Sequence, residues 1–167
     1  MSITMNFINL SKFDFTSKCN FLEEPGLKTH SQVPGRVMAA MHGNETLEVK
    51  QEFMSWYVDG HNEASVIWYP NTDASGNYDL ANCFGIKVHV PLQFLGMGPA
   101  PRWSPGHYFN MKLMNQGFAG FLWLDVSDDD QPKKYTFTGL KGYSVDVDPV
   151  CEHSAITVKV TIRTATN

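Results

Sequence analysis

The sequence predicts an all-β protein that folds as a single antiparallel β-sandwich domain over residues 1–167. Apolar and polar residues alternate with a period of two in segments from one end of the chain to the other. No window shows a 3.6-residue period flanked by helix caps. Runs rich in Gly, Asn, Asp and Pro separate the alternating segments at the intervals that a sandwich requires.

In the first half of the chain, alternating segments end at residues that favour turns. Asp59–Asn62 and Pro70–Asn77 contain the Gly, Asn, Asp and Pro residues that tolerate positive φ or preset a turn. We expect strands at Ile3–Asn9, Phe13–Phe21, Gly35–Met41, Thr46–Val58, Ala64–Trp68 and Tyr78–Val90.

In the second half, turns are expected at Asn115–Gly117, Ser127–Pro132 and Gly139–Gly142. The clearest strand is the last, because its apolar residues share one face and its polar residues the other. We expect strands at Tyr108–Met114, Phe118–Val126, Lys134–Thr138, Tyr143–Val147 and Ala155–Thr164.

The segment Pro91–Asn110 combines four prolines and three glycines with large apolar and aromatic side chains. Prolines remove ladder donors and push the preceding residue out of the helical region, so we expect a long loop here. Loops lie at the surface, where large apolar side chains must fold back against the protein or contact a partner, and we expect a partner contact here. One of Trp68 and Tyr69 is expected to point into the core, because neighbouring strand residues face opposite sides. Tryptophan and tyrosine suit a lipid headgroup boundary or the face of a sugar ring. The predicted contact patch consists of Trp103, Tyr108, Phe109 and Arg102, with Trp68 and Tyr69 from an adjoining strand end.

Composition narrows the choice of partner. Aromatic residues make up 13% of the chain and charged residues 18%, and the net charge is -4. With no basic run longer than Lys133-Lys134, non-specific nucleic-acid binding and docking to anionic lipid by charge alone are disfavoured. The N-terminus lacks the features of a signal peptide, so we expect a soluble protein that is made in the cytoplasm. Release from the cell would allow it to act at target cell membranes. Cys19, Cys83 and Cys151 have no paired spacing and are expected to be reduced.

Signals for metal binding or catalysis are weak. The six histidines are scattered without metal-ligand spacing, so no metal and no cofactor is expected. The acidic run from Asp125 to Asp130 could supply calcium ligands, to which Asp146 and Asp148 could add more, but a solvated hairpin tip is favoured. No Gly-x-Ser-x-Gly motif is present, so we name no catalytic residue and do not expect an enzyme.

The order of features resembles the β-sandwich of the actinoporins and aegerolysin-like proteins. The segments that carry this resemblance are Phe7–Ser11, Pro34–Val37, Ser65–Tyr69, Asp79–Phe84, the aromatic loop and the last amphipathic strand. Pro91–Pro105 is longer than the corresponding turn, and Ala64 stands where the family has glycine. No N-terminal amphipathic helix precedes Ile3, which makes the chain more similar to the aegerolysins.

The resemblance implies a lipid-binding toxin component that acts alone as a homo-oligomer on the membrane or with a larger pore-forming partner. We therefore expect a β-sandwich that binds a membrane lipid or a glycan headgroup, as a cytolytic or insecticidal protein. One alternative is a carbohydrate-binding lectin of the same fold. A second is a hydrolytic enzyme with a cleft between the sheets.

Overall fold

The computed structural model describes residues 2–19, 34–41, 43–50, 61–71, 82–91, 101–108, 121–124, 126, 133–152 and 155–166. These residues form eleven strands: β1 Ser2–Leu10, β2 Phe15–Cys19, β3 Pro34–Met38, β4 Gly43–Lys50, β5 His61–Pro70, β6 Phe84–Pro91, β7 Arg102–Tyr108, β8 Phe121–Trp123, β9 Tyr135–Phe137, β10 Tyr143–Glu152 and β11 Ala155–Thr164. The predicted all-β class is confirmed, and β11 has the bounds that its alternation indicates.

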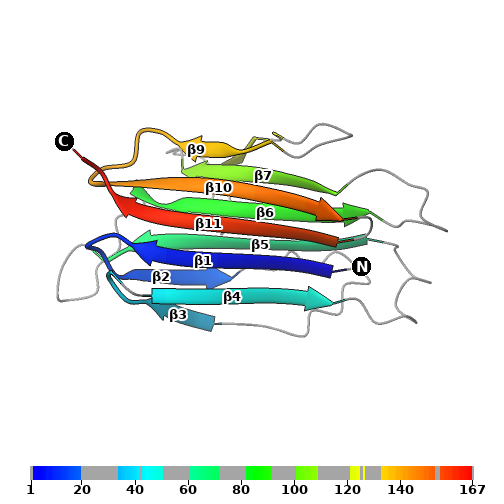
Figure 1. Ribbon diagram of the computed structural model, residues 1–167, viewed down its shortest axis with the longest axis horizontal. Coiled ribbons are helices and arrows are strands. Elements are labelled where there is room, and N and C mark those ends of the chain that lie inside the picture. The colour runs from blue at the N-terminus through cyan, green and yellow to red at the C-terminus, as the bar shows by residue number, and fades with distance from the viewer. Residues whose placement is uncertain are drawn as a thin grey trace, which may run out of the picture.

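The strands build two layers. The first sheet has the order β4-β1-β11-β10-β9 and the second the order β3-β2-β5-β6-β7-β8 (Figure 1). One pairing departs from the expected antiparallel sandwich, because β1 and β11 run parallel, with Ser2 opposite Ala155. The first and last strands share no short turn that would force them to run in opposite directions. The other paired strands are antiparallel.

The core lies between the two sheets and is rich in aromatic rings. Phe7 of β1 packs on Trp68 of β5 with ring centroids 5.2 Å apart, which joins the layers at the centre. Tyr143 of β10 meets Phe15 of β2 at 5.0 Å. Aromatic pairs at such distances add to the stabilisation from burial alone.

Strand β7 corrects the prediction for Pro91–Asn110. Residues 102–108 form a strand between β6 and β8, although they include Pro105. The Pro105 carbonyl accepts the N–H of Leu124, 3.0 Å away, so the backbone of Pro105 faces the β8 side. Proline has no N–H to return that bond, and β8 ends one residue earlier, at Trp123. The proline is therefore accommodated where the ladder stops. The expected strand at Tyr108–Met114 falls outside the described residues beyond Tyr108.

A buried polar corner fixes the end of β1. Asn9 is fully buried, and its Nδ2 donates to the carbonyls of Phe13 at 2.7 Å and Ala39 at 3.0 Å. Its Oδ1 accepts the backbone N–H and the hydroxyl of Ser11. The side chain thus satisfies the backbone where the chain leaves the first sheet for the second.

Candidate functional site: a polar groove on the outer face of β9, β10 and β11

The structure places three of the six predicted contact residues away from solvent. Trp68 is 0% exposed, Trp103 1% and Tyr69 8%. Trp68 and Trp103 belong to the core between the sheets, because their positions on β5 and β7 face inward. Trp68 and Trp103 cannot touch a membrane or a sugar from there, which corrects the expectation for these two residues. Tyr69 is largely buried as well.

The rest of the predicted patch is only partly described. Arg102 is exposed at the start of β7. Tyr108 ends the same strand, but its side chain lies outside the described part. Phe109 and residues 92–100 also lie outside the described residues. The contact function of these positions stays a prediction.

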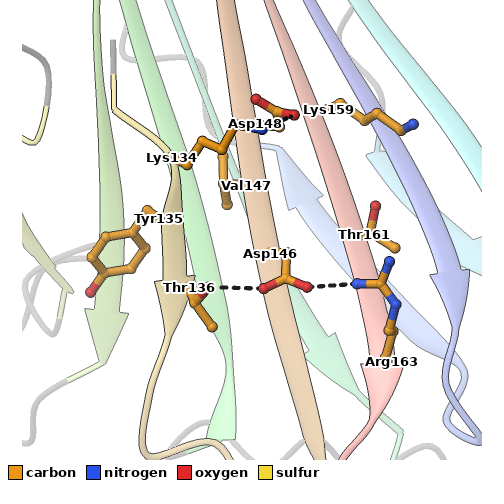
Figure 2. Close-up of a pocket in the computed structure, with 9 residues that line it drawn as sticks. All are labelled: Lys134, Tyr135, Thr136, Asp146, Val147, Asp148, Lys159, Thr161 and Arg163. Atoms are coloured by element: carbon orange, nitrogen blue, oxygen red, sulfur yellow. Dashed lines mark hydrogen bonds and ion pairs between the residues drawn. The ribbon is translucent and has the colours of Figure 1, made fainter.

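A hollow of about 310 Å³ lies instead on the first sheet, and we call it the outer groove. Figure 2 shows its lining side chains on β9, β10 and β11 and just before β9. They are Lys134, Tyr135, Thr136, Asp146, Val147, Asp148, Lys159, Thr161 and Arg163. Its size is near the lower end of the range of roughly 300–1,000 Å³ for small-molecule sites.

Asp146 is held between two neighbouring strands. Thr136 of β9 donates its hydroxyl to one carboxylate oxygen at 2.9 Å. Arg163 of β11 donates Nη1 to the other at 2.6 Å (Figure 2). A carboxylate bound on both sides has a fixed orientation, while about half of its surface stays open to solvent.

Strand register explains this arrangement. Asp146 lies opposite Thr136 on β9 and opposite Thr161 on β11, so the three side chains form one row across the outer face. Arg163 lies opposite Ser144 and reaches Asp146 along the diagonal. A second row places Asp148 opposite Lys159.

The groove carries more positive than negative charge. Three cations, Lys134, Lys159 and Arg163, face two carboxylates, a formal balance of +1 on a chain whose net charge is -4. Lys134 Nζ donates to Asp148 at 3.0 Å, so both carboxylates are paired. Lys159 has no ion pair with another described residue, and its ammonium points away from Asp148 (Figure 2).

Beneath the groove, one hydrogen bond joins the two sheets. Tyr135 Oη of β9 and His107 Nε2 of β7 are 2.7 Å apart. The rings of Phe137 and Trp103 surround the pair, with centroids 4.9 Å from His107 and 6.1 Å from Tyr135, respectively. Burial lowers the pKa of His107 and raises that of Tyr135, so both groups favour their neutral forms.

This pair is the feature of the described core that general acid–base chemistry could use. A neutral imidazole can accept a proton from a reacting group, and a neutral phenol can donate one. The pair also has a structural role, because it ties the short strand β9 to the opposite sheet.

Metal binding finds no support in the described part of the chain. No group of three His, Cys, Asp or Glu side chains there could hold an ion. Asp146 and Asp148 pair with cations instead. Asp125 and Asp128–Asp130 lie outside the described residues, so the expectation of a solvated tip stays a prediction.

Sequence reasoning missed most of the groove. Alternation does place Lys159, Thr161 and Arg163 on one face of the last strand, and Asp146 and Asp148 on one face of the preceding one. The pairing register that brings these two faces together depends on distant strands and leaves no local pattern.

Comparison with known proteins adds no assignment. No family model and no curated protein matches this sequence. The resemblance to actinoporins and aegerolysins therefore remains an expectation from the order of features. Within the described residues, no helix has the length and apolar character needed to cross a membrane.

Proposed function

We propose that this protein is a non-enzymatic binding protein whose outer groove recognises a glycan headgroup. The observation that carries the proposal is the Asp146 carboxylate, oriented by Thr136 and Arg163 on the floor of an open hollow. Sugar hydroxyls both donate and accept hydrogen bonds, and carboxylates, hydroxyls and cationic side chains are their natural partners.

The polarity of the described surface favours a sugar over an acyl chain. The two tryptophans of the predicted contact patch, Trp68 and Trp103, are core residues. Among the described residues, none of the large hydrophobic side chains that are exposed is aromatic; they are Leu10, Met41, Leu124 and Val150. A polar groove binds a headgroup through hydrogen bonds and needs no insertion into the bilayer.

The molecule that carries the glycan, a membrane lipid or a protein, determines the biological role that we propose. A glycan on a membrane lipid would make the protein a component of a cytolytic or insecticidal toxin, acting as an oligomer or with a larger partner. A glycan on a protein would make it a lectin in the ordinary sense. Both use the same groove.

A glycan array probed with fluorescently labelled protein tests the proposal, followed by calorimetric titration of the bound glycans. Asp146→Asn removes the oriented charge and should weaken binding about ten-fold or more, because hydrogen bonds to charged groups contribute about 1.5–3 kcal/mol. Asp14→Asn is the matched control. Asp14 is an exposed carboxylate outside the groove, and it accepts the Ala40 N–H at 2.7 Å. The Asp14→Asn variant should bind glycans as the wild type does.

Two results would count against the proposal. One is a labelled protein that binds no glycan on the array. The other is equal loss of binding in both variants, which would move the site elsewhere. Binding to protein-free phosphatidylcholine liposomes that free sugars do not compete would support lipid recognition instead.

The enzyme alternative has one observation in its favour, the His107–Tyr135 pair. Incubation of the protein with the bound glycan, followed by mass spectrometry of the sugar, separates the two functions. An unchanged glycan is expected, and a cleaved glycan would establish hydrolysis.

A further inference from the structure

The charges of the outer groove select among glycans. We infer that the groove takes an acidic sugar, one that carries a carboxylate or sulfate group, and that Lys159 is the residue that binds this group. The inference rests on the proposed function and narrows it to one class of ligand.

Both carboxylates of the groove already have a cationic partner. Asp146 is bound by Arg163 at 2.6 Å and Asp148 by Lys134 at 3.0 Å. An incoming cation would meet carboxylates whose charges these partners already balance. An incoming anion meets Lys159, which has no such partner among the described residues, and displaces nothing.

Lys159 has a defined position among the residues that line the groove. It stands on β11 between Asp148 on one neighbouring strand and Asn6 on the other. Thr161 lies two positions along the same face, roughly 6–7 Å away at the rise of about 3.3 Å per residue in a strand. That spacing fits a single sugar ring, with its acidic group on Lys159 and a hydroxyl on Thr161.

The groove differs in charge from the chain as a whole. A protein of net charge -4 repels anions at long range, whereas the groove has a local excess of one positive charge. Exposed charges further apart than a Debye length of about 8 Å are screened at physiological salt, so the local excess governs recognition.

Matched pairs of glycans test the inference. The probes are methyl β-D-glucuronide and methyl β-D-glucoside, together with sialylated, sulfated and uronated array glycans beside their neutral counterparts. The acidic member of each bound pair should bind more tightly, and its advantage should shrink in 1 M NaCl.

Variants locate the contact. Lys159→Gln should weaken binding of the acidic sugar about two- to five-fold, the range for an exposed ion pair, and leave the neutral sugar unaffected. Lys159→Arg should retain the preference. Lys141→Gln removes an equal charge from an exposed turn outside the groove and should change nothing.

The outcomes separate the two proposals. If neutral sugars bind as tightly as acidic ones, or if Lys159→Gln behaves as Lys141→Gln does, the acidic class is wrong while glycan binding stands. If no sugar of either kind binds, both proposals fail. Equal binding to sugar-free liposomes that contain phosphatidic acid would show an anion site without sugar selectivity, which also overturns the inference.

Discussion

Replacing Trp103 by alanine distinguishes a core residue from a contact residue. The side chain is 1% exposed and packs beside Tyr135, with ring centroids 6.1 Å apart. Truncating a buried tryptophan costs about 3–5 kcal/mol. At about 2–4 °C per kcal/mol for a chain of this size, the melting temperature should fall by about 6–20 °C.

Trp103→Phe refines the test. Among the described residues, the indole Nε1–H of Trp103 has no hydrogen-bond partner. A phenyl ring keeps much of the packing and forfeits no hydrogen bond, so the loss should be on the order of 1–2 kcal/mol. Differential scanning fluorimetry and urea titration give both values.

An alanine variant that melts within about 2 °C of the wild type would refute this reasoning. If that variant also lost its ligand, Trp103 would be an exposed contact residue, as the proline-rich segment first indicated.

Three further predictions concern stability. Asn9→Ala should destabilise the fold by about 3 kcal/mol, because it leaves several backbone groups at the buried corner unpaired. The control, Asn6→Ala on the exposed face of β1, should change the urea midpoint of unfolding little. Equal losses of stability in the two variants would contradict the role assigned to Asn9. Because the pKa of His107 is lowered in the folded state, its contribution to stability is present above about pH 6.5 and is lost as the pH falls through the folded-state pKa. His107→Gln should therefore flatten this part of the plot of unfolding free energy against pH. An unchanged slope in the variant would contradict this role of His107. Gly43→Ala should lower the unfolding free energy by about 2 kcal/mol or more, since the added Cβ would lie 2.5 Å from the Ala39 carbonyl oxygen. Gly139 has a φ of +78° and open space around it, so Gly139→Ala should lower the unfolding free energy by about 1 kcal/mol. The reverse order of the two melting temperatures would be inconsistent with the structure.

Local patterns were sufficient for the strands that have one wet face. Ala155–Thr164 alternates without interruption, so its bounds follow from the sequence, and β1 differs from the predicted Ile3–Asn9 by one residue at each end. Strand β7 was missed because the rule against proline in sheets applies only where the missing N–H is needed. At Pro105 the neighbouring strand has already ended.

The candidate site was harder to predict than the fold. Tryptophan in a proline-rich segment is equally compatible with a core and a contact surface, and only the inward position of Trp103 on β7 decides between them. The groove depends on the register of three strands, and on the diagonal reach of Arg163 to Asp146, neither of which local sequence encodes.

The parallel pairing of β1 with β11 has a consequence for how the protein is made. β11 joins the β4–β1 pair to the β10–β9 pair, and its pairing with β1 brings together residues 153 positions apart, such as Ser2 and Ala155. During synthesis, the edge of β1 that pairs with β11 therefore stays unpaired until β11 leaves the ribosome. Contacts of such long range slow folding, and Lys159, Thr161 and Arg163 arrive with that last strand. A nascent chain without β11 thus lacks three of the residues that line the outer groove, and the groove forms only after β11 has been synthesised.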